Sequence, residues 1–165
     1  VVAGGLPWVD SKILCASYVF MNNHVATHGT YLLLLECDKQ VELSIGKLGK
    51  MTTEPGHYLY VGSAFGPGGI QARVRHHRKT AARPHWHIDY LRVAAELLDA
   101  WCVYGIRCEH AWAYSLMQSE AAVMPLKGFG SSDCDCATHL FYFRQKPVKA
   151  ELEKRLNNKL ASVKV

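Results

Sequence analysis

The sequence predicts an α+β domain in which a small mixed β-sheet is flanked by helices. Three observations favour this fold class. Residues 29–37 (GTYLLLLEC) are a continuous apolar run that begins with a glycine, as is typical of a central strand. Residues 56–62 alternate between two kinds of side chain, which is the period of a strand with two different faces. A glycine-rich turn follows, and then Ile70 and Val74 recur at helical spacing.

Shorter segments complete the expected order of elements. Residues 41–45 alternate, and we expect them to pair with the 29–37 strand across the turn at 38–40. A glycine-marked turn then leads to a short strand at 50–53. The remaining expected elements are a short helix that opens at Trp86, a strand at 97–104, a helix at 109–118, a strand at 140–143 and a helix that opens at Pro147.

Two of these helices carry apolar residues on one side. In the 109–118 helix, the residues expected to be packed or half packed are Ala111, Tyr114, Ser115 and Met117. In the last helix, the apolar stripe consists of Val148, Leu152, Leu156 and Leu160. We interpret that stripe as either core or a contact with a partner.

Length and composition bound the organisation of the chain. With 165 residues, 49% of them hydrophobic, it is long enough for one domain with a substantial core. We divide it into an N-terminal extension at 1–28, a main domain at 29–146 and an amphipathic C-terminal helix at 147–165. Because Met21 resembles a natural start, residues 1–20 are interpreted as an upstream extension.

Cysteine usage bears on the cellular compartment. The six cysteines show no regular disulfide spacing, and Cys37 and Cys102 lie in apolar, strand-like runs, as expected of buried thiols. No apolar run is long enough to cross a membrane. These features indicate a reducing, cytoplasmic setting.

Positive charge is concentrated in one segment. Residues 71–92 contain six basic residues and one acidic residue, a balance equal to the whole net charge of +5. Such a patch favours a polyanionic partner, although a solvated helix face accounts for the charge equally well. Within the segment, Arg73 and His77 lie four residues apart and share a helix face. A tyrosine of the preceding strand would face them, and phenol, guanidinium and imidazole together suit a phosphate.

Two tripeptides point to a known class of protein. GTY at 29–31 and YVG at 60–62 resemble the paired signature of the GIY-YIG nuclease superfamily, and the spacing to Arg73 and His77 resembles its helix. More narrowly, four blocks resemble the Uri-type endonuclease branch: GTYLLLL, GHYLYVGSA, RPHWHIDYL and GFGSSDCDCATHLFYF. They cover residues 29–143 in family order, so the resemblance is specific. It implies a GIY-YIG-like fold and a metal-dependent endonuclease, a hydrolase of phosphodiester bonds in nucleic acid, with DNA expected and RNA left open.

The resemblance implies a catalytic set of Tyr31, Tyr60, Arg73 and His77. Arg73 would donate its planar fork of N–H groups to phosphate oxygens, the alternative being an ordinary surface arginine. One of the two tyrosines would orient or deprotonate the attacking water, and the sequence leaves open which. Since a free phenol titrates near pH ~10, such a base needs help from the metal or from Arg73. Ordinary strand packing is the alternative for both tyrosines, and Tyr58 is excluded because it lacks the following Val-Gly.

The resemblance also implies a single metal-binding glutamate on the helix after the third strand, which is Glu109 here. Glu96 and Glu120 are rivals, and a glutamate at a helix start also serves as a capping charge. One carboxylate with several waters suits Mg2+ (or Mn2+).

A further set of residues is expected to contact the nucleic acid. They are Arg75, Arg78, Lys79, Arg83, His87 and Ser132. Asp89 either contacts substrate or pairs with a nearby arginine.

The motif Cys134-x-Cys136-x-x-His139 raises a zinc site as an alternative feature, with Cys108 or His110 as a fourth ligand. The Cys-x-Cys spacing is tighter than that of the common zinc motifs. Packed thiols are therefore the preferred interpretation.

The rival function is a non-catalytic nucleic-acid-binding module on the same fold. A third hypothesis is a partner-dependent scaffold or a homodimer that docks through the C-terminal helix. The presence of every residue type of the catalytic set argues against a decayed site. No separate DNA-reading segment is visible in the sequence, so we expect low sequence specificity.

Overall fold

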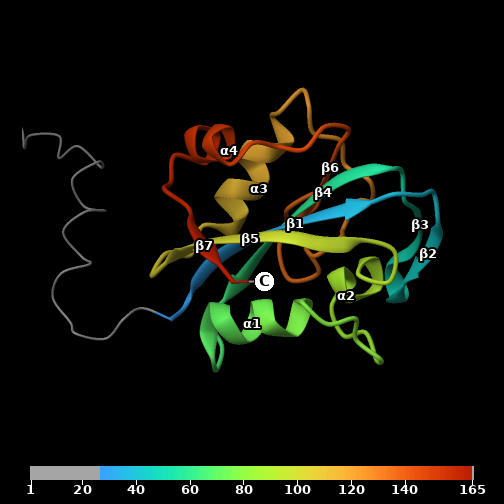
Figure 1. The fold of residues 1–165 in the computed structure, drawn as a ribbon, viewed down its shortest axis with the longest axis horizontal. Coiled ribbons are helices and arrows are strands. Elements are labelled where there is room, and N and C mark those ends of the chain that lie inside the picture. The colour runs from blue at the N-terminus through green and yellow to red at the C-terminus, as the bar shows by residue number, and fades with distance from the viewer. Residues whose placement is uncertain (1–26, 165) are drawn as a thin grey trace, which may run out of the picture.

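The apolar run at residues 29–37 forms β1 (Gly29–Cys37), the middle strand of a five-stranded sheet (Figure 1). The computed structural model describes residues 27–164. The spatial order of the strands is β6-β4-β1-β5-β7, and every neighbouring pair is antiparallel. The other four strands are β4 (Gly56–Ala64), β5 (Glu96–Tyr104), β6 (Leu140–Phe143) and β7 (Ala161–Val163). The predicted α+β class is confirmed, with a sheet that is antiparallel rather than mixed.

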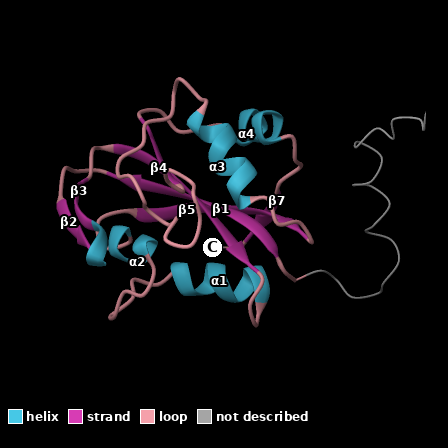
Figure 2. Ribbon diagram, turned by 180° about the vertical axis from the view of Figure 1, so that it is seen from behind, coloured by secondary structure: helices cyan, strands magenta, loops and turns pink. Residues whose placement is uncertain are grey.

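Helices cover both faces of this sheet, which explains why β1 is apolar without alternation. Tyr31, Leu33 and Leu35 pack into the core beside α1 and α2. Leu32 and Leu34 point the other way, into the core beside α3 and α4. Figures 1 and 2 show the two helical layers on opposite sides of the strands. The helices are α1 (Gly69–His77), α2 (His87–Leu91), α3 (Glu109–Met117) and α4 (Lys149–Leu156).

A separate two-stranded ribbon corrects one prediction. β2 (Glu42–Ile45) and β3 (Gly49–Thr52) pair with each other across the 3-10 turn at Gly46–Leu48. The expected pairing of this segment with β1 is wrong, because β4 and β5 occupy both edges of β1. Glycine permits the tight turn, since Gly46 and Gly49 have φ values of 49° and 111°.

The C-terminal segment is more than the expected helix. α4 ends at Leu156 because Asn157 adopts a left-handed conformation with φ 51°. The chain then returns as β7, which pairs with β5 and completes the same sheet. The leucines of the predicted stripe are core residues, whereas Val148 is exposed. A partner at α4 would therefore have to use its polar outer face.

The buried face of α3 differs from the expected one. Ala111 and Tyr114 are exposed, so this part of the prediction is wrong. The residues that α3 buries are Glu109, Trp112, Ala113 and Leu116. Trp112 also donates its indole N–H to Asn158 Oδ1 at 2.9 Å, which joins α3 to the turn after α4.

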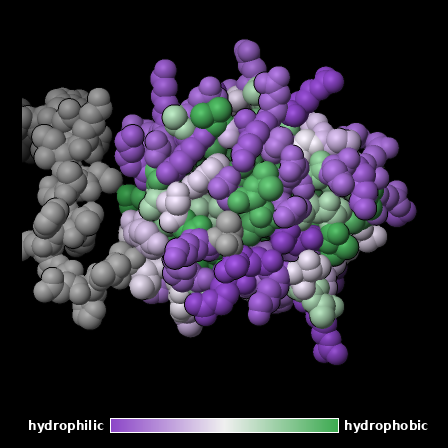
Figure 3. All heavy atoms as spheres, viewed as in Figure 1, coloured by the Kyte–Doolittle hydropathy of each residue, from purple (hydrophilic) through white to green (hydrophobic). Residues whose placement is uncertain are grey.

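Hydrophilic residues dominate the face in Figure 3, with smaller hydrophobic areas between them. No helix within residues 27–164 has both the length and the hydropathy that a membrane span requires. The predicted extension at 1–20 lies outside the described residues, as does all but the end of the 1–28 segment.

Gly62 of β4 gives a test of the packing between the two central strands. It lies opposite Tyr31 of β1, and a Cβ at this position would collide with the Tyr31 ring. We expect Gly62→Ala to lower the free energy of unfolding by about 1–3 kcal/mol, as overpacked core positions do. Chemical denaturation measures this change. Gly66→Ala is the matched control, because a methyl group there meets nothing within 4 Å. Equal stability of the two variants would contradict the account.

Candidate active site

A pocket of about 460 Å³ lies where β1, β4, α1, the start of α3 and the loop before β6 meet. Its walls are formed mainly by polar side chains, from a phenol pair on the strands to a loop that contains Ser132 and Asp133. The structure brings four predicted residues to this pocket from four different elements. They are Tyr31, Tyr60, Arg73 and Glu109.

The two tyrosines come together because β1 and β4 are adjacent and antiparallel. Tyr31 pairs with Gly62, and the Tyr31 and Tyr60 ring centroids lie 6.4 Å apart. The sequence analysis excluded Tyr58 from the catalytic set, and Tyr58 is indeed absent from the pocket lining. Its hydroxyl is engaged instead by the backbone N–H and C=O of Glu54.

Both pocket phenols are protonated at neutral pH. Burial raises the pKa of Tyr31 well above its usual value, and the neighbouring Tyr60 raises it further. Burial also raises the pKa of Tyr60, although the positive charge of Arg73 opposes the shift. Either phenol can act as a base only if another group accepts its proton or stabilises the phenolate.

Arg73 faces the pocket from α1. Its guanidinium carbon lies 4.1 Å from the centre of the Trp86 ring, a cation–π contact that holds the plane of the side chain. Within residues 27–164, no carboxylate forms an ion pair with Arg73. Its N–H donors are therefore available for an anionic ligand, and a guanidinium matches phosphate geometry.

His77 lies behind Tyr31 rather than in the pocket lining. It is almost fully buried, and its Nε2 lies 3.2 Å from the Tyr31 hydroxyl. Its Nδ1 lies 3.3 Å from Asp89 Oδ1. Burial lowers the pKa of His77 despite the adjacent carboxylate. The neutral ring thus donates from Nδ1 to Asp89, and its Nε2 accepts from the Tyr31 hydroxyl.

Asp89 lies outside the pocket lining and, within residues 27–164, pairs with histidines rather than with an arginine, so the predicted arginine pair is wrong. Its contact with substrate stays a prediction. Asp89 is buried and accepts hydrogen bonds from His76 and His77 and from the backbone N–H groups of His85 and Trp86. Burial would raise the pKa of Asp89, but these hydrogen bonds outweigh it and hold the pKa well below the usual range. Asp89 is therefore ionised and orients His77.

Glu109 and Asp133 are the two carboxylates among the residues that line the pocket, and Glu109 is the one that the sequence predicts as a metal ligand. It is buried at the first turn of α3, and its Oε1 lies 3.3 Å from a guanidinium nitrogen of Arg107. Its Oε2 is buried and makes no hydrogen bond within the described part of the chain. A buried oxygen without a donor suits a cation, and a single carboxylate suits Mg2+ or Mn2+. The rivals Glu96 and Glu120 are exposed and lie outside the pocket.

The remaining predicted residues divide into two groups. His87 and Ser132 line the pocket. Burial lowers the pKa of His87, and its Nδ1 accepts the Gly130 N–H at 2.9 Å, so the proton of the neutral ring is on Nε2. The exposed residues outside the pocket are Arg75, Arg78, Lys79 and Arg83.

Sequence reasoning missed Arg107 and His139 at the site, and it considered His110, which also lines the pocket, only as a possible zinc ligand. Arg107 is the ion-pair partner of Glu109. The only signal in the sequence that could have identified it is its position two residues before that glutamate. His139 lines the pocket from the end of the loop before β6. It had been considered only as part of the cysteine motif.

Comparison with known proteins places the chain in a family. It belongs to the family described as "Domain of unknown function DUF123", which matches residues 30–161. The match runs from the start of β1 to the start of β7 and so includes every pocket residue. Neither the curated proteins nor the solved structures gave a match.

Two histidines with lowered pKa values, His77 and His87, make stability depend on pH. Because the pKa values of His77 and His87 are lowered by folding, the unfolded chain binds protons more readily. We therefore expect the free energy of unfolding to be highest above the pKa of histidine in the unfolded chain, about 6.5, and to decrease as the pH falls below that pKa. The depressed pKa of Asp89 adds a further loss only below about pH 4.

Melting temperatures at about pH 7.5 and pH 5.5, on either side of the pKa of histidine in the unfolded chain, measure this effect. The decrease should be smaller in His77→Gln, which removes one of the titrating groups. An unchanged melting temperature across this window in the wild type would contradict the assignment of neutral, buried histidines.

Proposed function

We propose that this protein is a metal-dependent endonuclease of the GIY-YIG type that hydrolyses phosphodiester bonds in nucleic acid, with DNA as the preferred substrate. One observation carries the proposal. Glu109 lines the same pocket as Tyr31, Tyr60 and Arg73, and its buried Oε2 makes no hydrogen bond within residues 27–164. The family to which the chain belongs is known as a GIY-YIG-like, Uri-type domain, which supports the assignment.

Arg73 binds the scissile phosphate in this proposal. Trp86 holds one face of the guanidinium, so the N–H groups at its edge can donate to two phosphate oxygens. The same donors stabilise the charge that builds up on these oxygens in the transition state. Glu109 would hold a divalent cation, and that cation would supply Lewis-acid stabilisation to the phosphate.

Tyr31 is the better candidate to activate the attacking water. It can pass its hydroxyl proton to Nε2 of His77 as it takes a proton from the water, and Asp89 stabilises the imidazolium that forms. The hydroxyl of Tyr60 makes no hydrogen bond within residues 27–164. We therefore assign Tyr60 to orienting the water or the phosphate.

The exposed basic residues of α1 and the following loop would hold the nucleic-acid backbone beside the pocket. This charge also supports the rival function, a binding module that does not cut. Cys37, Cys102, Cys134 and Cys136 are free thiols, which supports a cytoplasmic setting.

Cleavage assays separate the enzyme from the binding module. Purified protein is incubated with plasmid, single-stranded and branched DNA and with matching RNA, in magnesium or EDTA. We expect Arg73→Ala to reduce cleavage by a factor of about 10²–10³ while retaining most of the binding, because a preorganised donor matters most in the transition state. Arg75→Ala is the matched control, since Arg75 is exposed on the same helix and outside the pocket.

Glu109→Gln should also be inactive, and higher magnesium should partly restore it if the residue is a metal ligand. Glu120→Gln controls for the loss of one exposed carboxylate. A well-folded Arg73→Ala protein that cuts at the wild-type rate would leave only the binding-module function.

Binding itself should depend strongly on salt. The logarithm of the affinity for duplex DNA is expected to fall with the logarithm of salt concentration by roughly 0.9 for each phosphate contacted. The double variant Arg78→Glu, Lys79→Glu should weaken binding to all sequences and reduce that slope. Lys149→Glu, Lys154→Glu is the control, because α4 lies on the opposite face of the sheet. Equal effects of the two double variants would show that the basic segment has no special role.

A further inference from the structure

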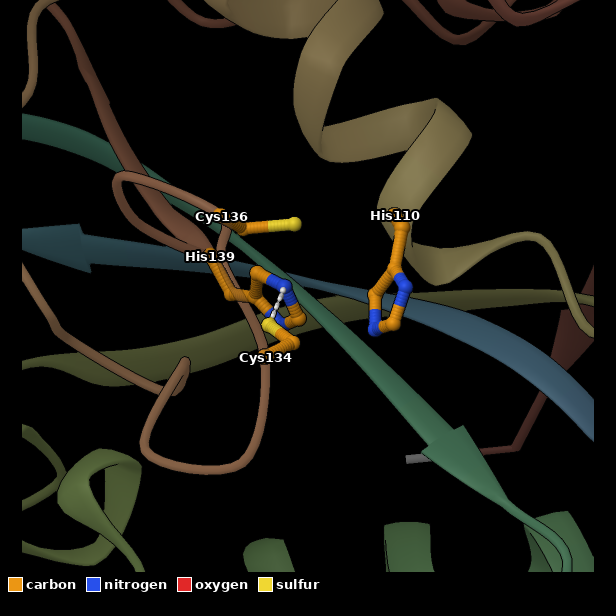
Figure 4. Close-up of side chains that lie close together, drawn as sticks. All are labelled: His110, Cys134, Cys136 and His139. Atoms are coloured by element: carbon orange, nitrogen blue, oxygen red, sulfur yellow. Dashed lines mark hydrogen bonds between the residues drawn. The ribbon is translucent and has the colours of Figure 1, made fainter.

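Four metal-ligating side chains meet at the rim of the pocket, apart from the tyrosines and Arg73. His110 comes from the first turn of α3, and Cys134, Cys136 and His139 come from the loop before β6 (Figure 4). One ligating atom from each lies within 4.8 Å of those of the other three. We propose that these residues bind a structural zinc ion.

The chemistry and the spacing both fit zinc. Two thiolates and two imidazoles are a common tetrahedral zinc set. Zn–S and Zn–N bonds of about 2.3 and 2.0 Å require ligand atoms roughly 3.3–3.8 Å apart. Cys134 Sγ and His139 Nε2 are already 3.5 Å apart, and the His110 and His139 ring centroids are separated by 5.8 Å. Small side-chain rotations would complete the tetrahedron.

The backbone holds the ligands in place. His139 is tied to its neighbours on both sides, since its N–H donates to Phe129 O at 2.7 Å and its C=O accepts the Val61 N–H at 2.9 Å. The loop is closed by the Gly128 N–H, which donates to Ala137 O at 2.7 Å. This closed loop places Cys134 and Cys136 on the side that faces α3, as Figure 4 shows.

The other cysteines of residues 27–164 do not belong to this cluster. Cys108 was one of two candidates for the fourth ligand, and the structure selects His110 instead. Cys37 is buried at the end of β1, where its thiol donates to the Lys39 and Ala94 carbonyls. The preferred interpretation of the motif as packed thiols does not explain why two imidazoles converge on the same pair of sulfurs.

A zinc ion here would join the loop to the start of α3. The neighbouring residues on both segments face the pocket, namely Glu109 beside His110 and Asp133 beside Cys134. Four protein ligands leave no open coordination position, so the role is structural rather than catalytic. The inference does not depend on the proposed nuclease activity.

Metal analysis of the full chain tests this inference directly. After incubation with zinc and dialysis, the wild-type protein should contain one zinc ion per chain, as measured by inductively coupled plasma mass spectrometry. Cys134→Ser and His110→Ala should lose it, whereas Cys37→Ala removes a buried thiol outside the cluster and should retain it. Replacement by Co2+ should give the visible absorption of a tetrahedral site and a thiolate charge-transfer band, which Cys136→Ser should weaken.

Where a variant fails to fold, the wild type provides the second measurement. Removal of zinc with a chelator should lower its melting temperature, and added zinc should restore it. A folded wild type without stoichiometric zinc, a disulfide between Cys134 and Cys136, or zinc retained by the Cys134→Ser, Cys136→Ser variant would each overturn the inference. These readouts do not involve cleavage, so an inactive protein that binds zinc still supports it.

Discussion

The buried carboxylate of Asp89 joins α1 and α2 on one side of the pocket. Through His76 and His77 it holds the end of α1, and through two backbone N–H groups it holds the turn that enters α2. Trp86 in that turn stacks on Arg73, and His77 contacts Tyr31. The positions of the guanidinium and of the phenol therefore both depend on a residue that does not face the pocket.

The elements with a strong local pattern could be predicted from the sequence. β1, β4 and β5 are long strands with clear apolar or alternating runs, and α1 follows a glycine-rich turn. The convergence of Tyr31, Tyr60 and Arg73 could also be predicted, because neighbouring strands and the helix that follows them meet at one place. The prediction of Glu109 as the metal-binding glutamate came from the resemblance to a family rather than from any local pattern.

The remaining features depend on contacts between distant segments. The partner of β2 is decided by the occupation of both edges of β1, which no local pattern contains. The predicted buried face of α3 differed from the observed one by one residue. One residue is about 100° around a helix, which is enough to expose Tyr114. The Asp89 network crosses a loop, so no local pattern contains it. The sequence offered Cys108 or His110 as a fourth ligand of the cysteine motif, and the choice of His110 depends on how α3 packs beside the loop.

Counting the basic residues of segment 71–92 overstates how many of them are available to contact a polyanion. Arg92 belongs to the basic segment by sequence, yet its guanidinium donates to the backbone carbonyls of His77, Arg78 and Ala95. It thereby caps the C-terminal end of α1 and ties it to the strand that follows α2. One of the six cations is thus engaged within the fold, and removing it would destabilise the contact between α1 and the segment before β5.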